Sequence, residues 1–495
     1  MNNLLIVPIA VPLVTAMALV FLQKRPGVQL FAAIGSLLAS LAAAGMLIVQ
    51  NKTEGIQTLH VGGWEAPFGI TLVADMTASL LVAAALVIGI CCLLFARDPA
   101  LAGHHRHYFM PLMLILVVGT NGSFLTGDMF NLFVFFEVTL IASYVLLSLG
   151  GTKTQLRESI KYVLINMVAS TVFVVAVAYL YSLFGTLNMA HLAERAAEAG
   201  RDGLVTVVGL LFLVVFATKA ALLLFFWLPG PYGAPPMAVA ALFAALLTKV
   251  GIYAILRTFT LIFIHQPEVT RTVLLAMGAL TMLLGALGAV GHWGIRKILA
   301  YNVILSVGFI VFGIALADGE SLAGTLFYLL HDMIVKAWLF ILGGAVIAIA
   351  GTDRLREIKG LIRYRPQLGW MFLLAAMSVA GVPPLSGFTG KLLILKSGVG
   401  AGEYTVSVIG LATSLLAFYS LLKVFILSFW GETLLNEGEQ HATGRNAVLP
   451  GLVLAALSLG LGIGSGAVLD WLEPAVGTLL NPSVYIDAVL GAGIR

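Results

Sequence analysis

Residues 322–350 read LAGTLFYLLHDMIVKAWLFILGGAVIAIA, an apolar run with His331, Asp332 and Lys336 near its middle. A helix that crosses the hydrocarbon core of a bilayer needs about 20 consecutive apolar residues, and this run exceeds that length. The run is continuous, whereas the strands of a membrane β-barrel alternate between apolar and polar residues. The segment therefore predicts a membrane-spanning helix that carries ionisable side chains at membrane depth.

The remainder of the chain repeats this pattern. Hydrophobic residues make up 60% of the 495 residues and charged residues 10%, against about 25% charged residues in an average soluble domain. We therefore exclude a soluble, disordered or collagen-like protein and expect an all-α polytopic membrane protein with about 14 transmembrane helices. The apolar runs lie at about 4–22, 30–49, 72–95, 108–126, 129–149, 160–184, 206–228, 237–262, 272–291, 298–316, 322–350, 371–398, 405–429 and 447–468.

The composition also limits the cofactors, metals and partners. The net charge is +4, and no basic run is dense enough to follow a nucleic-acid backbone. Cys91 and Cys92 are adjacent within an apolar run, so they cannot form a disulfide framework or a metal site. The segments between the apolar runs are too short for a nucleotide-binding module. We therefore expect no nucleic acid, no metal and no cofactor.

The distribution of Lys and Arg between the loops predicts the orientation of the chain. The loops after odd-numbered spans hold 15 of these residues, whereas the loops after even-numbered spans, with the tail, hold seven. Because positive residues are retained in the cytoplasm, the loops after odd-numbered spans are expected there. Both termini lie on the opposite side from these loops, so we expect them outside. The seven are Lys52, Arg195, Arg201, Arg257, Arg271, Lys396 and Arg495.

The remaining five lysines lie inside predicted spans: Lys219, Lys249, Lys336, Lys391 and Lys423. A charged side chain at mid-membrane costs about 2.5–3.5 kcal/mol, so such residues indicate an ion path. The first two lysines are 30 residues apart and the last two 32, and the pairs are offset by 172 and 174 residues. Repeats of five helices would give this offset, with one copy inverted. Lys423 lies near the end of its span, where it could equally extend to the interface.

The acid placed to pair with a lysine is Glu137, in the middle of the run 128–150. A carboxylate near a buried lysine changes the proton affinity of the amine. A pair of Glu137 and Lys219 could therefore take up and release a proton, and the alternative is a structural ion pair between two helices. Thr218 and Thr248 precede two of the lysines and are candidate accessory residues.

His331, Asp332 and Lys336 form the second group of ionisable residues. A spacing of four residues puts Asp332 and Lys336 on one face of a helix, with His331 about 100° aside. Histidine titrates near neutral pH and can relay protons. The alternative is an intrahelical salt bridge without a role in transport. A metal site would need more ligands than this span offers.

Two segments interrupt the apolar sequence with proline and glycine. One is WLPGPYGAPP at residues 227–236, and the other is AGVPPLSGFTG at residues 380–390, with Pro383 and Pro384 in it and Lys391 directly after. Non-helical backbone at membrane depth is tolerated only where protein buries it or where it lines a wet cavity. The second segment therefore predicts a helix break beside a charge, whereas the first could also be a tight loop between two spans.

Four segments give the chain a family resemblance. Residues 127–137, 234–251, 331–337 and 381–391 resemble the proton-pumping antiporter-like subunits of respiratory complex I, membrane-bound hydrogenases and Mrp-type multisubunit Na+/H+ antiporters. The resemblance covers roughly residues 70–430, and it is greatest to the D subunits of the Mrp antiporters, which this length also fits.

The resemblance implies 14 helices with two inverted five-helix repeats and with helices 7 and 12 interrupted. It divides the chain into helices 1–3 (residues 1–107), a first repeat (108–262), a second repeat (263–430), and helix 14 with the tail (431–495). It also implies one proton path through buried residues. The residues on this path are Glu137, Lys219, Lys249, His331, Lys336 and Lys391. From the sequence itself, Asp332, Thr218, Thr248 and Lys423 are candidate accessory residues.

We therefore expect a proton-translocating subunit of a monovalent cation (Na+)/H+ antiporter in a bacterial cell membrane, which is a secondary transporter and not an enzyme. The expected partners are a larger homologous subunit, small hydrophobic subunits, the lipid bilayer, H+ and Na+. One alternative is the proton-pumping subunit of a redox complex. Another is a scaffold in which buried ion pairs only fix helix packing.

Overall fold

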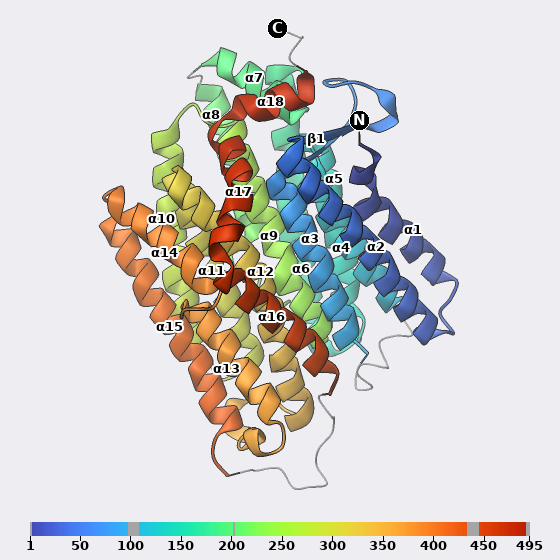
Figure 1. Ribbon diagram of the computed structural model, residues 1–495, viewed down its shortest axis with the longest axis vertical. Helices are drawn as coiled ribbons and strands as arrows, with labels where there is room; N and C mark the ends of the chain where they lie inside the picture. Colours follow the sequence, from blue (N-terminus) through green and yellow to red (C-terminus); the bar gives the residue numbers. More distant parts are fainter. Residues whose placement is uncertain (1, 98–107, 201–202, 433–444, 492–495) are drawn as a thin grey trace.

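The computed structural model describes residues 2–97, 108–200, 203–432 and 445–491, most of which are helical. The long helices run side by side along one axis, and two short strands lie at one end (Figure 1). The elements are α1 (Val7–Val20), α2 (Pro26–Thr53), β1 (Gln57–His60), β2 (Thr71–Ala74), α3 (Met76–Phe95), α4 (Phe109–Leu125), α5 (Met129–Ser148), α6 (Lys153–Phe184), α7 (Met189–Ala199), α8 (Gly203–Ala220), α9 (Met237–Leu261), α10 (Pro267–Gly291), α11 (Ile295–Leu316), α12 (Gly319–Ala350), α13 (Pro366–Ala380), α14 (Gly387–Gly400), α15 (Tyr404–Phe429), α16 (Val448–Ile463), α17 (Ser465–Leu480) and α18 (Pro482–Leu490).

Each apolar run overlaps at least one of these helices; the run at 371–398 overlaps α13 and α14, and the run at 447–468 overlaps α16 and the start of α17. Twelve helical segments of the described residues are long and apolar enough to cross a membrane, and α4 and α13 are shorter apolar helices. The expectation of an all-α polytopic membrane protein is confirmed.

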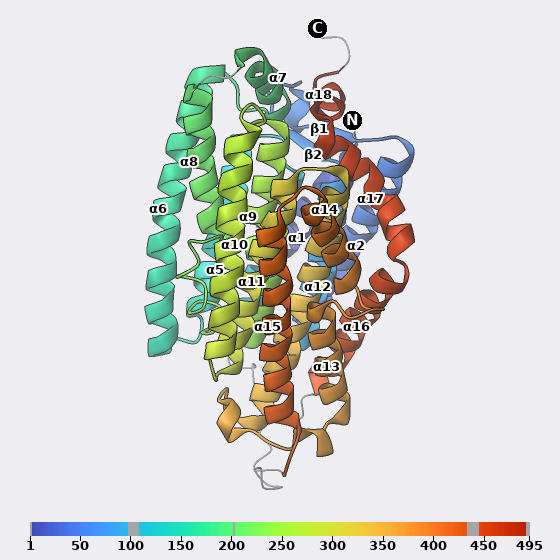
Figure 2. The same ribbon diagram turned by 90° about the vertical axis from the view of Figure 1, so that its left-hand side faces the viewer.

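Three helices form the centre of the bundle. In α9, every residue of the most apolar 18-residue stretch is buried. The buried share of the corresponding stretch is 94% in α11 and 83% in α12, but only 33–44% in α1, α6 and α15. A helix that is apolar on every side belongs in the interior of a protein. Figure 2 shows α6 at one flank and α17 at the opposite flank of this centre. Ionisable groups on α9 and α12 are therefore shielded from lipid by surrounding helices.

Side-chain caps fix where several helices begin. Asp75 accepts a hydrogen bond of 2.8 Å from the backbone N–H of Ala78 at the start of α3. Thr152 and Gln155 form a capping box at the start of α6, and Asp318 forms another with the start of α12. These side chains pair N–H groups that have no acceptor within the helix.

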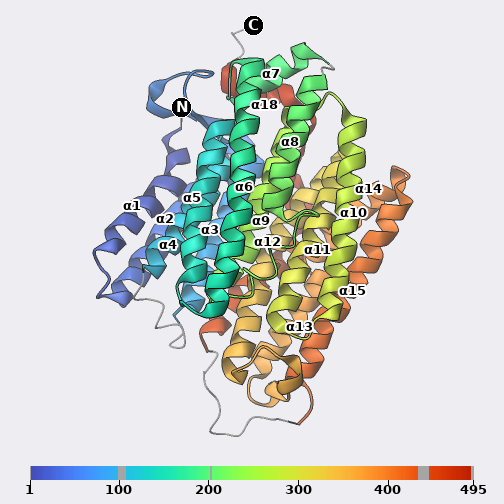
Figure 3. The same cartoon turned by 180° about the vertical axis from the view of Figure 1, so that it is seen from behind.

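The first helix break begins earlier than the sequence predicts. A helix is expected over 206–228, but α8 ends at Ala220, and residues 221–236 form turns and irregular backbone before α9. Ala221 and Leu223 have φ angles of 60° and 59°, which a right-handed helix does not contain. Figure 3 shows α8 ending part-way along the bundle. Residues 221–236 are therefore non-helical backbone that joins α8 to α9, and no second half of the seventh helix follows the break among the described residues.

Specific hydrogen bonds hold this irregular segment. Arg296 of α11 donates to the carbonyl groups of Gly233 at 3.1 Å and Pro235 at 2.8 Å. The indole N–H of Trp227 donates to the carbonyl of Thr218 at 3.0 Å, which ties the segment back to the last turn of α8. Backbone that has left a helix in an apolar interior needs such partners.

The second break separates α13 from α14. Gly381 has a φ of 87°, and its N–H bonds to the carbonyl of Met377 at 3.1 Å, which ends α13. Residues 381–386, including Pro383 and Pro384, are non-helical, and α14 follows. The predicted interruption of the twelfth span is therefore present, with Lys391 in the first turns of the second half.

The two termini lie at the same end of the bundle, next to α18 and the hairpin of β1 and β2 (Figure 1). In that hairpin Gln57 pairs with Ala74 and His60 with Thr71, in antiparallel register. Several residues of the loop count lie within helices, and Arg257 lies deepest, inside α9 and 3% exposed. Arg106, Arg201 and Arg495, which also entered that count, lie outside the described residues.

Candidate functional site

Glu137 of α5 and Lys219 of α8 face each other across a serine from α6. Lys219 Nζ lies 3.7 Å from Glu137 Oε1. Ser170 accepts a hydrogen bond from Lys219 at 3.0 Å and donates one to Glu137. The sequence predicts the two charged residues, but Ser170 was missed because no spacing rule connects it to either of them. Three helices therefore meet at one polar contact.

The two charged side chains differ in exposure. The Lys219 side chain is 2% exposed and the Glu137 side chain 28%. The ring of Phe136 lies 5.4 Å from Lys219 Nζ, an arrangement that attracts an ammonium group to the face of the ring. Glu137 is consequently the member of the pair nearer to the surface of this chain, and Lys219 is the member nearer to the core.

The end of α8 brings Lys219 close to the helix that carries Lys249. A Cβ atom on Gly251 of α9 would lie 2.6 Å from the backbone nitrogen of Ala220. Only glycine allows the two backbones to approach this closely. Ala220 directly follows Lys219, and Gly251 is two residues from Lys249, so this contact joins the first charged pair to the central cluster.

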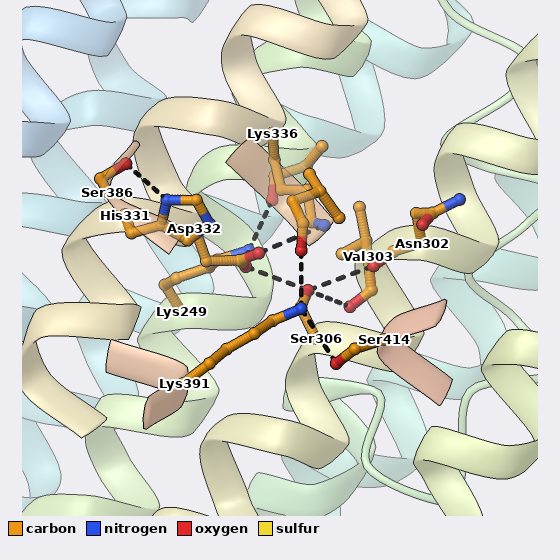
Figure 4. A network of polar contacts seen from close by, with 12 residues as sticks. Lys249, Asn302, Val303, Ser306, His331, Asp332, Lys336, Ser386, Lys391 and Ser414 are labelled. Carbon is orange, nitrogen blue, oxygen red and sulfur yellow. Dashed lines mark hydrogen bonds and ion pairs between the residues drawn. The ribbon is translucent and has the colours of Figure 1, made fainter. Parts of the chain in front are cut away.

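Asp332 is the centre of that cluster (Figure 4). Its Oδ2 lies 2.7 Å from Lys249 Nζ, and its Oδ1 lies 3.3 Å from Lys336 Nζ. Ser306 of α11 donates to Oδ2 at 3.1 Å, and Lys249 also donates to the carbonyl of Ala244 at 2.9 Å. The expected pairing of Asp332 with Lys336 on one helix face is present. The contact with Lys249 was not expected, since it joins two helices that are distant in sequence.

His331 points away from this carboxylate toward the second helix break (Figure 4). Its Nδ1 lies 2.7 Å from Ser386 Oγ. Ser386 in turn lies 2.9 Å from Ser458 of α16, and Ser458 lies 2.9 Å from Ser378 of α13. No sequence pattern indicates Ser458, which belongs to the last predicted span.

Lys391 of α14 is held by backbone that the break leaves free. Its Nζ donates to the carbonyl of Val379 at 2.6 Å and to Ser414 of α15 at 2.9 Å, and the carbonyl of Ala380 lies at 3.4 Å. These carbonyls belong to the last turn of α13, where helix carbonyls lack intrahelical partners and carry partial negative charge. The ring centroid of Phe309 lies 5.7 Å away. The break therefore creates a site for a cation.

Lys423 lies apart from these groups. Its Nζ donates to the carbonyls of Val290 at 2.8 Å and His292 at 2.7 Å, where α10 ends. The ring of Trp293 lies 4.9 Å away. This geometry is that of a lysine that caps a helix C-terminus.

The two threonines beside the lysines differ in their contacts. Thr218 Oγ1 donates to the carbonyl of Val214 in its own helix at 2.8 Å. Thr248 Oγ1 is buried and has no hydrogen-bond partner within the described part of the chain. Neither hydroxyl makes a hydrogen bond to Lys219 or Lys249 in the described structure.

A further buried ion pair, which sequence analysis missed, joins Asp75 and Arg257. Arg257 Nε also donates to the hydroxyl of Tyr253 at 3.3 Å, and its guanidinium lies 5.0 Å from the ring centroid of Tyr485 in α18. The sequence does contain a signal for a buried charge here, because Arg257 lies inside the apolar run 237–262. Counting it as a loop residue concealed this.

Comparison with known proteins identifies the family of this chain. Residues 126–417 match the family described as "NADH:quinone oxidoreductase/Mrp antiporter, TM". The D subunit of the Na(+)/H(+) antiporter of Bacillus subtilis (strain 168) is 46% identical over 99% of this chain and all of the relative. The chain belongs to the antiporter D-subunit family.

Two solved structures contain a chain with the same fold as this member of the D-subunit family. A chain of the Mrp complex from Dietzia sp. is 32% identical and superposes with a TM-score of 0.91, over 99% of this chain and 100% of that one. A chain of a membrane-bound sulfane sulfur reductase, an archaeal respiratory membrane complex, is 27% identical with a TM-score of 0.88 over the same shares. The fold is therefore common to antiporter and respiratory assemblies.

Proposed function

We propose that this chain is the proton-translocating subunit of a multisubunit monovalent cation (Na+)/H+ antiporter in a bacterial cell membrane. One observation carries the proposal: ionisable groups follow one another from the half-buried Glu137 and the buried Lys219, through the buried Asp332 cluster, to the buried Lys391. Charged groups inside a membrane protein are costly and mark ion paths. The named function of the Bacillus subtilis relative supports the choice of Na+ and H+.

The first pair supplies the point of entry. Glu137 is the exposed member, and Ser170 can accept from Lys219 while it donates to Glu137. The nearby carboxylate stabilises the protonated amine. A movement of Glu137 away from Lys219 removes that stabilisation, so the lysine releases its proton toward α9.

The central cluster passes the proton on. Lys249 and Lys336 share Asp332 as their counter-charge. When one lysine loses its proton, Asp332 remains fully available to the other, which favours the protonated form there. His331 adjoins this cluster, and Lys391 completes the path at the helix break. Water molecules or side-chain rotation join the groups that no direct hydrogen bond connects.

We further propose the orientation, the repeat boundaries and the partner subunits of this chain. We place both termini outside, in accord with the charge of the loops and with the common end of the two termini (Figure 1). The two inverted repeats occupy residues 108–262 and 263–430, between helices 1–3 (1–107) and helix 14 with the tail (431–495). The chain works with a larger homologous subunit and small hydrophobic subunits, as a transporter component and without a cofactor of its own.

The test uses the complete complex in everted membrane vesicles from cells that lack other Na+/H+ antiporters. Glu137→Gln and Lys219→Ala are expected to abolish Na+-dependent dissipation of a pH gradient while the complex still assembles. Full antiport in both variants would remove these residues from the mechanism. Loss of assembly, with normal activity in the complex that remains, would support the scaffold alternative instead.

The likeness to a respiratory membrane complex favours one other candidate, the proton-pumping subunit of a redox complex. Mild extraction of the tagged chain separates the two. Small hydrophobic membrane subunits without flavin or iron–sulfur absorbance support the antiporter. Peripheral subunits with iron–sulfur absorbance would keep the proton path and replace the driving reaction.

A further inference from the structure

Three serine hydroxyls form a triangle beside His331. Ser378 and Ser386 each lie 2.9 Å from Ser458, measured between Oγ atoms, and 3.4 Å from each other. Ser386 Oγ is also 2.7 Å from His331 Nδ1. All three serines are 0% exposed. A buried hydroxyl without a partner is unfavourable, so the protons of these hydroxyls are directed within the group.

The protons of the triangle can be arranged in two ways. A hydroxyl donates one hydrogen bond and accepts up to two. In the first arrangement Ser386 donates to His331 Nδ1, Ser458 donates to Ser386, and Ser378 donates to Ser458. In the second, Nδ1 carries a proton and donates to Ser386, which now donates to Ser458. Ser458 then donates to Ser378, and Ser378 closes the ring on Ser386. Every hydroxyl proton has an acceptor in both arrangements.

We propose that this triangle is a positioning element that lets His331 Nδ1 gain or lose a proton without leaving a buried hydroxyl unpaired. Rotation of the three hydroxyl groups is enough to change between the arrangements. Both short sides of the triangle end at Ser458, which makes it the essential member. The inference rests on the proposed function, since proton transfer through His331 is the step that needs this reversal.

The packing of α16 holds Ser458 in place. Gly462, one turn after Ser458, lies against the second helix break. A Cβ atom there would be 2.7 Å from the carbonyl carbon of Leu385 and 2.8 Å from the backbone nitrogen of Ser386. The backbone of α16 therefore contacts the break directly, and the distance between Ser458 and Ser386 is set by this contact.

The charges that act on His331 come from other residues. Asp332 and Lys336 lie on the same helix, Lys249 on α9 and Lys391 on α14. The ring of Tyr328 lies 5.1 Å from the imidazole ring. Substitution of Ser458 alters none of these groups. A change in proton transfer in a Ser458 variant therefore reports the hydroxyl triangle and not the charges.

The experiment measures antiport in everted vesicles that contain the complete complex. Ser458→Ala removes the short-range acceptor that Ser386 needs when Nδ1 is protonated. We expect antiport to slow by about tenfold, the effect of one lost hydrogen bond, and the pH–rate profile to move to lower pH. Ser458→Thr keeps the hydroxyl and should restore most of the rate. Ser378→Ala keeps the short contact of Ser386 with Ser458, so its effect should be smaller.

Controls separate the possible failures. Ser428→Ala removes a buried hydroxyl without a partner among the described residues, and it should leave antiport unchanged. If Ser458→Ala does not assemble, Ser458→Cys replaces it, because a thiol is a weak donor of similar size, and the same slowing is expected. An unchanged rate and pH profile in these variants, with Lys219→Ala inactive, would overturn this inference alone. Full activity of Lys219→Ala would overturn the proposed function.

Discussion

The carboxylate of Asp332 lies 2.7 Å from Lys249 Nζ and joins α12 to α9 at the centre of the bundle. Its second oxygen lies 3.3 Å from Lys336. The side chains of all three residues are at most 2% exposed. Because one carboxylate serves two ammonium groups away from water, a change at Asp332 acts on both lysines at once.

Asp332→Asn should abolish antiport and destabilise the complex. It leaves two buried ammonium groups without a counter-charge, and loss of one partner of a buried ion pair costs about 3–5 kcal/mol. Asp332→Asn combined with Lys249→Met leaves one unpaired ammonium group, Lys336, in place of two, so it should recover part of the thermal stability and remain inactive. The measurements are the melting temperature of the purified complex and antiport in vesicles. Normal transport by Asp332→Asn would contradict the path through this cluster.

Ser170→Ala should slow antiport without preventing assembly. Ser170 lies between Lys219 and Glu137, and a hydrogen bond to a charged group contributes about 1.5 kcal/mol or more, which corresponds to roughly tenfold in rate. Ser182→Ala is the matched control on the same helix, because within the described part of the chain Ser182 bonds only to the carbonyl of Tyr179, at an exposed position. Equal rates for the two variants would show that Ser170 has no part in the transfer.

Lys423→Ala should reduce the amount of assembled complex but not the antiport rate of each complex. Its ammonium group bonds to the carbonyls of Val290 and His292 at the end of α10, which is a structural task. Lys423→Arg keeps a donor there and should assemble normally. Antiport normalised to the amount of complex in the membrane is the measurement. A fully assembled but inactive Lys423→Ala complex would place Lys423 on the proton path.

Asp75→Asn should destabilise the complex by about 3–5 kcal/mol through the unpaired charge of Arg257, and leave the antiport rate of each assembled complex unchanged. The amide oxygen of asparagine can still cap α3, so the effect isolates the ion pair. Asp75→Asn combined with Arg257→Gln should recover part of the stability. Thermal unfolding of the purified complex measures both variants, and loss of antiport in a stable complex would give this pair a role in transport.

The class of fold and most of the site could be predicted from the apolar runs and the lysines within them. Burying a lysine costs so much free energy that a lysine inside an apolar run indicates a functional site. Lys219, Lys249, Lys336 and Lys391 stand out within apolar runs, and all four are buried in the structure. The pairing of Asp332 with Lys336 follows from helix periodicity alone. The prolines at 383 and 384 likewise predict the break beside Lys391.

The remaining features depend on contacts between distant segments. Nothing near Ala220 predicts the end of α8 there, because the apolar sequence continues to Trp227. Serine is common in helices, so the sequence does not distinguish Ser170 and Ser458 from other serines. Their hydrogen bonds to residues of other helices are known only once those helices are placed. Arg257 was misassigned for a different reason, since its position near the end of a run resembles that of a loop residue.

Lys391 lies beside the Asp332 cluster (Figure 4), and the group of Lys249, Lys336, Lys391 and Asp332 holds three lysines and one carboxylate. With every lysine protonated and His331 neutral, its net charge is therefore two positive units, and like charges in a medium of low dielectric constant repel strongly. On the proton path proposed above, a further proton therefore enters this group only as another leaves, and protons pass singly. A membrane potential of 100 mV contributes about 2.3 kcal/mol for each charge that crosses. On that path, voltage acts on this subunit through the proton occupancy of its lysines.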